Sequence, residues 1–495
     1  MQLGQLASLL LTARLAGDAN IELNGIQIDS RKVMQGDLFI CLPGHTVDGH
    51  DFAPQAAERG AAAFVAERPL PVDAPQLIVK DSRHAMAVLA DYFFGSPSRK
   101  LKLIGITGTN GKTTTTYLIE RILADAGFKP GVIGTVERRF GGRSYPMSGT
   151  TPEALELQRH LAAMIEAGTD CCAMEVSSHA LEQGRVKGCR YRTAIFTNLT
   201  QDHLDYHGTM QRYAAAKELL FARLGNEYAL SPEERAYAVL NADDSASGGF
   251  ARATSAEVLT YGVDNEADVR ASNIRITAHG TSFHLETFDG STDITLNMAG
   301  KFNVYNALAA VCAALIERVP LDQIKSSLEA VPGVPGRVES VHAGQKFAVI
   351  VDYAHTPDGL DNVLKAVKEF AAGRIICVFG CGGDRDRSKR PIMGAIAGRY
   401  ADYAIVTSDN PRTESPERIL LDIEAGLIKD GVPKSRYVLL PDRRAAIQKA
   451  VEMASPEDVV LIAGKGHETY QIIGDVTYDF DDREVAKEAI RSITP

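Results

Sequence analysis

A glycine-rich segment at residues 108–114, GTNGKTT, has the residue types that hold a phosphate chain. It follows the apolar run LKLIGIT and precedes a run in which aliphatic residues from Leu118 to Leu123 recur at helical spacing. This order predicts a buried strand, a tight turn and a helix. Because Ile106 stands where the longer phosphate loop has its first glycine, the segment is a shortened variant of that loop.

The start of such a helix suits a nucleotide triphosphate. Its free backbone N–H groups and its dipole attract phosphate, Lys112 can reach the terminal phosphate, and Thr113 can contact Mg²⁺. The predicted nucleotide contacts in this loop are Gly108, Thr109, Asn110, Gly111, Lys112, Thr113 and Thr114. The loop alone fits a GTPase, a motor, a kinase or a ligase. Since the sequence has no NKxD segment of the GTPase kind, we expect a small-molecule acceptor.

Two polar residues follow strand-like runs, and either could hold a metal near the phosphates. Glu175 lies in DCCAMEVSS, and His203 follows YRTAIFTNL. Carboxylate and imidazole groups are both common ligands of divalent ions. Taken singly, each residue also fits a hydrogen-bonded structural role.

The elements that must position these residues belong to more than one domain, because 495 residues are too many for a single hydrophobic core. The 45% hydrophobic and 23% charged residues are typical of globular proteins, and the net charge of -10 argues against nucleic acid as the main partner. The opening segment, MQLGQLASLLLTARLAG, predicts an amphipathic helix rather than a signal peptide, and no run has the apolar length of a membrane span. We therefore expect a cytoplasmic protein. The scattered cysteines, without paired CxxC spacing, predict reduced core thiols.

Changes in composition divide the chain into three segments. The polar stretch FGSPSRKLK marks one boundary, and the prolines and glycines of VPGVPGR indicate an interdomain hinge near residue 335. We predict domains at 1–98, 99–335 and 336–495. In the middle segment, apolar runs alternate with helical ones, which indicates a largely parallel sheet, and residues 268–298 alternate as in a small antiparallel meander.

The third segment repeats one pattern. IICVFGCGGDRDRSK, YAIVTSDNPRTE and VVLIAGKGHETY each place Gly, Asp, Arg, Asn or His directly after a strand-like run. Ligand sites in open α/β sheets lie outside the carboxyl ends of the strands, so we expect these loops to converge on one crevice. The fold class is therefore α/β.

Together these segments closely resemble the Mur ligase family, which includes the folylpolyglutamate synthases. The resemblance rests on GTNGKTT, AMEVSSHAL, FTNLTQDHLDYHG, GKFNVYNALAA, GRVE and VDYAHTPD, in that order along the chain. It implies a smaller N-terminal α/β domain at 1–98 that binds a UDP precursor. It also implies a central ATP-binding P-loop domain at 99–335 with a mostly parallel sheet, and a Rossmann-like domain at 336–495 that binds an amino acid.

The resemblance also implies an ATP-dependent ligase. ATP, with Mg²⁺, would phosphorylate a substrate carboxylate, and an amine would attack the acyl phosphate to leave an amide, ADP and phosphate. The physical logic is sound, since a carboxylate becomes electrophilic only when one oxygen becomes a good leaving group, and Mg²⁺ with Lys112 can neutralise the developing charge.

Residue roles follow from the family motifs. The resemblance implies catalytic roles for Lys112, Glu175, His203, Lys217 and His355, and metal ligation by Thr113, Glu175, His203 and Lys217. The resemblance also implies that Lys217 is carbamylated to N6-carboxylysine, whereas the sequence alone predicts an exposed lysine on a helix. It implies further nucleotide contacts at Asn303, Arg337 and Asp352.

Two more groups of residues bear on the substrates. The resemblance implies that UDP-N-acetylmuramoyl-L-alanyl-D-glutamate is bound by Ile28, Ser30, His45, Thr46, Val47, Thr150, Thr151, Ser177, Gln183 and Arg185. Before the Thr150-Thr151 pair, Gly149 stands where the family often has Asn. The resemblance assigns meso-diaminopimelate to Arg385, Asp409, Asn410, Pro411, Arg412, Gly464 and Glu468. The Arg412 guanidinium could pair with the distal carboxylate, which lysine lacks. Arg387 is chemically equivalent to Arg385.

The sequence thus predicts a monomeric enzyme of peptidoglycan synthesis, with small molecules as its partners. Four alternatives stay open: a lysine-adding relative, a relative adding D-alanyl-D-alanine, a folylpolyglutamate synthase, and a nucleotide-binding module without catalysis. Such a module would bind ATP yet release no phosphate. We expect domain closure in an enzyme, because its sites must meet around one acyl phosphate and exclude water.

Overall fold

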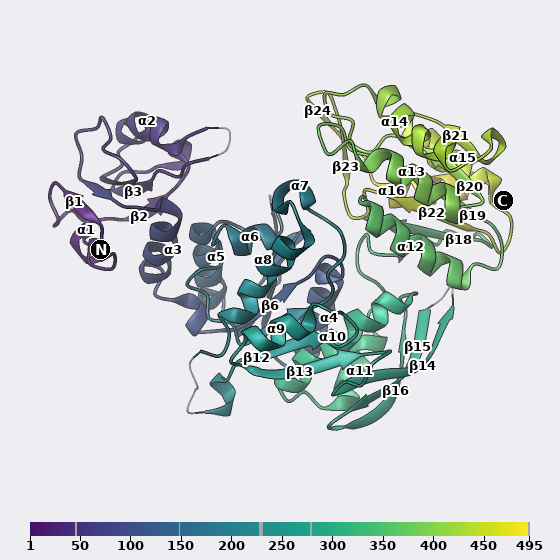
Figure 1. The fold of residues 1–495 in the computed structure, drawn as a ribbon, viewed down its shortest axis with the longest axis horizontal. Helices are drawn as coiled ribbons and strands as arrows, with labels where there is room; N and C mark the ends of the chain where they lie inside the picture. The colour runs from purple at the N-terminus through teal and green to yellow at the C-terminus, as the bar shows by residue number, and fades with distance from the viewer. Residues whose placement is uncertain (45–46, 148, 227–230, 278–279, 494–495) are drawn as a thin grey trace.

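The computed structural model describes residues 1–495 except 45–46, 148, 227–230, 278–279 and 494–495. Figure 1 shows the chain as an N-terminal lobe in purple, a central lobe in blue, teal and green, and a C-terminal lobe in green and yellow. Each lobe is built on its own sheet with helices packed on it. The predicted three-domain α/β fold is confirmed. The boundaries 1–98, 99–335 and 336–495 remain our proposed division of the chain.

The N-terminal sheet has the strand order β1-β5-β4-β3-β2, parallel except for β1. Its strands are β1 (Arg14–Ala16), β2 (Gly25–Gln27), β3 (Asp37–Ile40), β4 (Ala63–Ala66) and β5 (Gln76–Ile78). Its helices are α1 (Leu3–Ala7), α2 (Ala53–Glu58) and α3 (Ser82–Phe93), with 3₁₀ turns η1 (Ser30–Lys32), η2 (Gly49–Phe52) and η3 (Pro97–Arg99).

The central sheet runs in the order β16-β15-β14-β13-β12-β11-β6-β10-β7-β8-β9. The strands from β7 to β13 in that order are parallel, as predicted. They are β6 (Lys102–Thr107), β7 (Pro130–Ile133), β10 (Cys171–Glu175), β11 (Thr193–Phe196), β12 (Tyr237–Asn241) and β13 (Glu257–Gly262). At one edge lie β8 (Glu137–Phe140) and β9 (Arg143–Pro146), and at the other β14 (Val269–Thr277), β15 (Gly280–Thr287) and β16 (Gly290–Leu296). The last three pair antiparallel, which confirms the predicted meander.

Helices cover both faces of the central sheet. They are α4 (Lys112–Asp125), α5 (Ala154–Glu166), α6 (Ser178–Glu182), α7 (Leu204–His207), α8 (Met210–Ala222), η4 (Pro232–Glu234), α9 (Ser247–Ala253), α10 (Lys301–Ile316) and α11 (Leu321–Glu329). The aliphatic face of α4 is buried at Leu118, Ile119, Ile122 and Leu123, as the spacing predicts, and packs with α10. α10 is rich in alanine because it is enclosed on most sides, so small side chains allow close approach.

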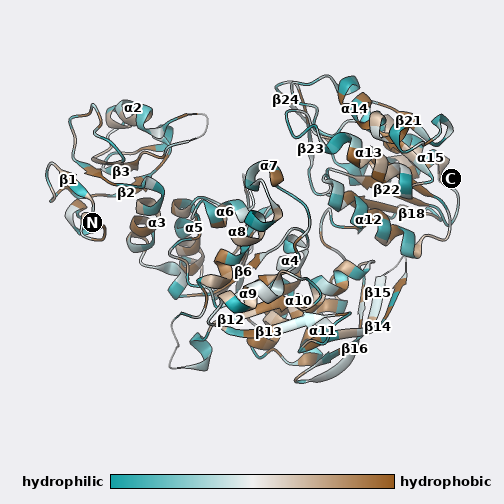
Figure 2. Cartoon of the chain, in the orientation of Figure 1, coloured by the Kyte–Doolittle hydropathy of each residue, from teal (hydrophilic) through white to brown (hydrophobic). Residues whose placement is uncertain are grey.

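The C-terminal sheet has the order β17-β18-β22-β19-β20-β21, parallel except for β17. Its strands are β17 (Glu339–Ser340), β18 (Ala348–Asp352), β19 (Ile375–Phe379), β20 (Tyr403–Val406), β21 (Tyr437–Leu439) and β22 (Val459–Ala463). Its helices are α12 (Pro357–Phe370), α13 (Lys389–Tyr400), α14 (Pro416–Lys429), η5 (Lys434–Arg436), α15 (Arg443–Met453) and α16 (Asp482–Ile493). A separate hairpin joins β23 (Tyr470–Ile473) to β24 (Val476–Asp479). Figure 2 shows the sheet strands as the apolar interior of this lobe.

One predicted element is wrong. The expected amphipathic helix over the first 17 residues is only the short α1, after which β1 pairs antiparallel with β5. An isolated helix of that length is marginal in water, so hydrogen bonds at a sheet edge can replace it. The cysteine prediction is confirmed, since all seven are free thiols and six of them are buried. Among the described residues, no helix combines the length and apolar character that crossing a membrane requires.

Candidate active site

The phosphate loop connects β6 to α4 in a conformation that only glycine accepts at two positions. Gly108 and Gly111 have φ of 153° and 86°, in the left-handed region. A side chain at Gly108 would collide with Thr197 Oγ1, and one at Gly111 with Asn306 Oδ1. The N–H groups of the first turn of α4 lack helical acceptors, so they are available to an anion.

The end of β11 holds this loop in place. Thr109 N donates to Asn198 O (2.9 Å), and Asn110 N donates to Asn198 Oδ1 (2.9 Å). Thr197 Oγ1 donates to Asn110 O at 2.6 Å. Lys112 Nζ lies over the loop, 2.9 Å from Gly108 O and 2.7 Å from Thr109 O. The loop is therefore preorganised by contacts with the neighbouring strand.

A cavity of about 540 Å³ opens above the loop, between the central and C-terminal lobes. This volume lies within the range of small-molecule sites. Of the predicted residues, its lining includes Thr109, Asn110, Gly111, Lys112, Thr113, Thr114, Thr150, Glu175, His203, Arg337, Asp352 and His355. The structure therefore brings most of the predicted catalytic and nucleotide-contacting residues to one cavity.

Hard oxygen donors meet beside the phosphate loop. Thr113 Oγ1 lies 3.0 Å from Glu175 Oε1, and Glu175 also accepts hydrogen bonds from Thr135 N (2.9 Å) and Thr135 Oγ1 (3.0 Å). Arg337 reaches Thr113 Oγ1 from the hinge, with its Nη2 at 3.2 Å. His203 lies at the same cavity with Nε2 3.3 Å from Asp202 Oδ2. Thr135 was not among the predicted residues, since it lies outside every motif.

Lys217 is buried rather than exposed, so the prediction from its helix alone is wrong. Its side chain, on α8, is about 1% exposed, and Nζ donates to Gly108 O at 2.9 Å. The ammonium lies 4.5 Å from the Tyr213 ring centre. Burial, and then the nearby Lys112 charge, hold the pKa of Lys217 well below its usual value. A buried amine with a lowered pKa is neutral more often and is therefore nucleophilic.

Two predicted nucleotide contacts have structural partners. The Asp352 carboxylate accepts from Val338 N and Ala354 N, each at 2.8 Å, and burial raises its pKa. Asn303 lies behind Asn306, whose Nδ2 donates to Asn303 Oδ1 at 3.2 Å. The cavity lining includes Asn306 but not Asn303. The set predicted from the sequence omitted Asn306, although it stands one helical turn from Asn303 in the same motif.

The predicted UDP-precursor residues form one group on the central lobe and another on the N-terminal lobe. Arg185 Nη1 donates to Thr151 O at 3.0 Å, Arg185 Nη2 donates to Gln183 Oε1 at 2.7 Å, and Ser177 N donates to Thr151 Oγ1 at 3.1 Å. Thr150 Oγ1 lies 3.0 Å from Thr135 Oγ1, which links this group to Glu175.

On the N-terminal lobe, Ser30 Oγ donates to Gln55 Oε1 at 2.7 Å, Ile28 is half-buried just after β2, and Val47 is exposed. His45 and Thr46 lie outside the described residues. The N-terminal group and the central group thus belong to different lobes.

The predicted diaminopimelate residues lie in the loops that follow the carboxyl ends of β19, β20 and β22. Asp409 and Asn410 are buried, and Asn410 Nδ2 donates to Glu468 Oε2 at 2.9 Å. Arg412 has a left-handed φ of 53°, and its Nη1 donates to Gly383 O at 2.9 Å. A Cβ on Gly464 would lie 2.7 Å from Asp409 Oδ2, so the two loops touch. The predicted convergence of these loops is present in the structure.

The two equivalent arginines differ in their partners. Arg387 is paired with Glu414 at 2.7 Å, whereas Arg385 is exposed and donates to the Asp384 carbonyl at 3.0 Å. A Cβ on Gly382 would lie 3.0 Å from Arg412 Nη1 and 3.7 Å from Arg385 Cγ, so these two side chains flank the same loop. Arg385 is therefore the one with a guanidinium free of carboxylate partners among the described residues.

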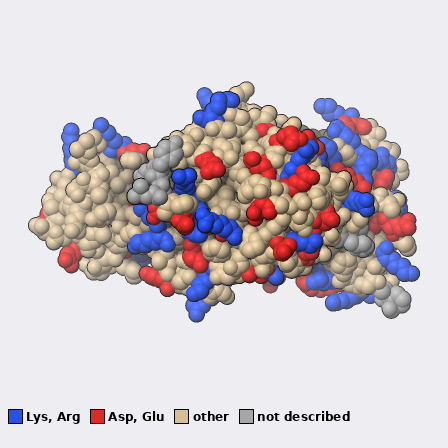
Figure 3. Space-filling view, turned by 90° about the horizontal axis from the view of Figure 1, so that it is seen from below, with Lys and Arg blue, Asp and Glu red and all other residues tan. Residues whose placement is uncertain are grey.

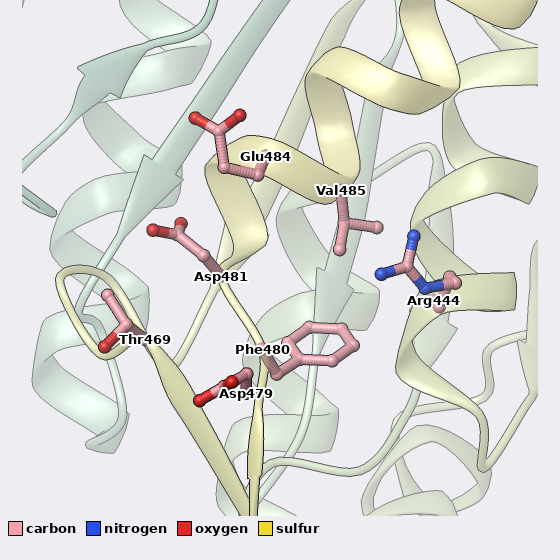
Figure 4. A pocket seen from close by; sticks show the side chains of 7 residues that line it. All are labelled: Arg444, Thr469, Asp479, Phe480, Asp481, Glu484 and Val485. Carbon is pink, nitrogen blue, oxygen red and sulfur yellow. The ribbon is translucent and has the colours of Figure 1, made fainter.

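A second hollow, of about 320 Å³, lies where β24 leads into α16. Figure 4 shows Asp479, Asp481 and Glu484 on one side of it and Arg444 on the other, with the Phe480 ring between Asp479 and Arg444. None of the predicted site residues lines this hollow. On the face in Figure 3, basic and acidic side chains intermingle, without a continuous basic stripe.

Comparisons with known proteins agree with the geometry. The Mur ligase family, catalytic domain, matches residues 22–94; the Mur ligase middle domain matches residues 106–314; and the Mur ligase, glutamate ligase domain, matches residues 336–466. A protein of Bacillus cereus named UDP-N-acetylmuramoyl-L-alanyl-D-glutamate--2,6-diaminopimelate ligase is 53% identical over 490 residues, covering 99% of this chain and 98% of that protein. A Geobacillus kaustophilus protein of the same name is 55% identical over 95% of this chain and 96% of its own length.

Solved structures show the same architecture. A structure of a UDP-N-acetylmuramoyl-L-alanyl-D-glutamate--2,6-diaminopimelate ligase superposes with a TM-score of 0.70 at 34% identity, over 99% of both chains. MurF from Acinetobacter baumannii shares the fold at 21% identity, with a TM-score of 0.67 over 94% of this chain and 95% of that one.

Proposed function

The chain belongs to the Mur ligase family, and on that premise we propose that it joins meso-2,6-diaminopimelate to UDP-N-acetylmuramoyl-L-alanyl-D-glutamate. It is an ATP-dependent ligase that forms an amide bond, and its product is a UDP-linked tripeptide of peptidoglycan synthesis. The observation that carries this proposal is the 53% identity over 490 residues with a ligase of that name. Folylpolyglutamate synthase activity or the addition of D-alanyl-D-alanine is a less suitable assignment, since solved structures of those two kinds of enzyme share only their fold with this chain.

The phosphate loop supplies the ATP site. The N–H groups at the start of α4 hold the phosphates, and Lys112 leaves the carbonyls of Gly108 and Thr109 to reach the terminal phosphate. Arg337, already 3.2 Å from Thr113 Oγ1, adds positive charge from the hinge side. These cations stabilise the charge that develops when the terminal phosphoryl group is transferred.

The donors beside the loop fit Mg²⁺. Thr113 Oγ1 and Glu175 Oε1, 3.0 Å apart, are hard oxygen ligands of the kind that this ion prefers, and His203 lines the same cavity. When bound, Mg²⁺ would neutralise phosphate charge and act as a Lewis acid. Thr135 holds Glu175 in place through its N–H and its hydroxyl.

Lys217 fits a modified, anionic role. Its lowered pKa leaves a neutral amine that can add CO₂, and the resulting carbamate turns a buried cation into an anion. That change would remove repulsion toward Lys112 and toward a divalent ion near the phosphates. We therefore propose N6-carboxylysine at position 217 and a role for it in holding Mg²⁺.

The reaction then proceeds in two steps. The side-chain carboxylate of the D-glutamate attacks the terminal phosphorus of ATP, which gives an acyl phosphate and ADP. The diaminopimelate amine attacks the acyl carbon, and the tetrahedral adduct collapses to the amide with loss of phosphate and a proton. Thr150, Thr151, Ser177, Gln183 and Arg185, which are interlinked beside Glu175, hold the precursor with Ile28, Ser30, His45, Thr46 and Val47.

The amine donor occupies the loops of the C-terminal lobe. Arg412 and Arg385 flank Gly382, so they can pair with the distal carboxylate, and Glu468 can accept a hydrogen bond from the distal ammonium. Asp409, Asn410, Pro411 and Gly464 shape the pocket, and His355 and Asp352 line the cavity above the phosphate loop. Lysine lacks the distal carboxylate and would leave both guanidinium groups unpaired. We further propose that the enzyme is a monomer and that it works in the cytoplasm, where small soluble substrates of this kind would reach it.

Phosphate release tests the proposal. The chain is supplied with ATP, Mg²⁺ and UDP-N-acetylmuramoyl-L-alanyl-D-glutamate, and meso-diaminopimelate is compared with L-lysine. We expect release with diaminopimelate and little with lysine. Equal or preferred use of lysine would show that diaminopimelate is not the specific amine substrate. Binding of ATP without phosphate release with either amine would indicate a nucleotide-binding module without catalysis.

A further inference from the structure

Lys465 is a fully buried cation that no step above uses. It follows Gly464 at the end of β22, and its side chain is 0% exposed. Its Nζ donates to Glu468 Oε2 at 2.9 Å and to Asn410 Oδ1 at 3.1 Å. The ammonium also lies 5.3 Å from the centre of the Tyr470 ring. A buried lysine is costly unless its charge is paired, so its partners indicate what it does.

The contacts of Lys465 determine the orientation of Asn410. Asn410 Oδ1 accepts from Lys465 and, at 2.9 Å, from Ile472 N, and both of these groups can only donate. The amide oxygen must therefore face them, which turns Asn410 Nδ2 toward Glu468 Oε2 at 2.9 Å. Lys465, Asn410 and Glu468 thus form a closed triangle of hydrogen bonds.

The triangle also fixes the Glu468 carboxylate. Both Lys465 and Asn410 bind Oε2, and among the described residues Oε1 has no hydrogen-bond partner. The Glu468 side chain is 14% exposed, and its Oε2 is held by two donors while its Oε1 stays available to a ligand. A carboxylate held in this way offers one preoriented acceptor to an ammonium group.

Charge balance indicates which substrate end this arrangement suits. Asp409 and Glu468 carry two negative charges, and Lys465, Arg412 and Arg385 carry three positive charges, so this set sums to +1. The neighbouring Arg443 is paired with Asp482 at 2.7 Å and adds no net charge. A pocket without net negative charge suits the distal end of diaminopimelate, which has both an ammonium and a carboxylate, better than the ammonium alone of lysine.

We propose that Lys465 is a positioning residue for the amine substrate, which fixes the Glu468 carboxylate and offsets its negative charge in the diaminopimelate pocket. This proposal rests on the proposed function. Lys465 acts through Glu468 and Asn410 and does not touch the reacting atoms. Without its charge the pocket becomes less positive, so selectivity shifts toward lysine.

Steady-state phosphate release tests this with Lys465→Met and Lys465→Gln, and with Lys429→Met as the matched control on the exposed end of α14. We expect Lys465→Met to raise the KM for diaminopimelate roughly ten- to a hundredfold, the size of one misplaced charge-assisted hydrogen bond. The KM values for ATP and the UDP precursor should stay near those of the wild type. Lys465→Gln, which keeps a donor, should raise KM less but lower the preference for diaminopimelate over lysine.

A double-mutant cycle separates this role from a general structural one. If Lys465 acts through Glu468, the combined Lys465→Met and Glu468→Gln variant should have a KM for diaminopimelate no higher than Glu468→Gln alone. The proposal would be overturned if the effects of Lys465→Met and Glu468→Gln on this KM were additive. It would also be overturned if Lys465→Met and Lys465→Gln both kept the KM and selectivity of the wild type, or if both failed to fold. If the wild type itself does not turn over diaminopimelate, the proposed function fails first, and the proposal fails with it.

Discussion

Asp358 links the C-terminal lobe to the phosphate loop, and its removal should loosen that contact. It lies in the first turn of α12, and its Oδ2 accepts hydrogen bonds from Asn110 Nδ2, Thr200 Oγ1 (2.7 Å) and Asn362 Nδ2 (3.1 Å). The first two donors belong to the central lobe. Asp358→Ala removes both interlobe bonds, at about 1 kcal/mol each for a half-exposed site. The total of about 2 kcal/mol shifts the equilibrium between docked and undocked lobes roughly thirtyfold.

Asp358→Asn separates the loss of the bonds from the loss of charge. Because all three donors meet one oxygen, an amide oxygen at that position can still accept them, so the asparagine variant should cost less than about 1 kcal/mol. Small-angle X-ray scattering should show a larger radius of gyration for Asp358→Ala, with Asp358→Asn near the wild type. Asp361→Ala, whose carboxylate pairs with Lys365 on the same helix, is the control. Identical scattering from the alanine and asparagine variants would refute this reasoning.

Three further predictions follow from the site. Gly111→Ala, at a φ of 86° and against Asn306, should abolish binding of a non-hydrolysable ATP analogue in calorimetry, and retained affinity would contradict the geometry. Arg412→Met should raise the KM for diaminopimelate roughly ten- to a hundredfold while the KM for ATP stays unchanged, as phosphate release can measure. Because burial lowers the pKa of Lys217, its neutral amine is present at lower pH than that of an exposed lysine, so the carbamate should persist to lower pH than on an exposed lysine and disappear on further acidification. Carbon-13 NMR with labelled bicarbonate should show that signal, and Lys217→Met should lack it.

Local patterns allowed much of the fold to be predicted. The strand, turn and helix around Gly108 and Gly111 follow from short-range spacing, and so does the buried face of α4. The meander at β14 to β16 follows from simple alternation. The helix predicted at the start of the chain is too long, because part of that segment forms β1 instead. Local spacing does not reveal the pairing of β1 with β5, since it joins residues far apart in the sequence.

Site residues could be predicted from the sequence only where they belong to recognisable motifs. Lys217 stands on a helix whose sequence gives no sign that Nζ would reach Gly108, because that burial depends on how α8 packs beneath the loop. Asn306 and Asn303 are one turn apart, and only packing decides which one faces the cavity. Lys465 lies between two glycines of a motif, and its contacts with Asn410 and Glu468 depend on how two strand ends meet.

The proposed mechanism depends on activation of the precursor carboxylate by phosphorylation before the amine attacks. The most direct measurement uses UDP-N-acetylmuramoyl-L-alanyl-D-glutamate labelled with ¹⁸O in the glutamate side-chain carboxylate, with ATP, Mg²⁺ and meso-diaminopimelate. Mass spectrometry then follows the label in the products. An acyl phosphate predicts that one labelled oxygen appears in the released phosphate and the other in the new amide. Phosphate released without label, while the amide forms, would contradict this mechanism.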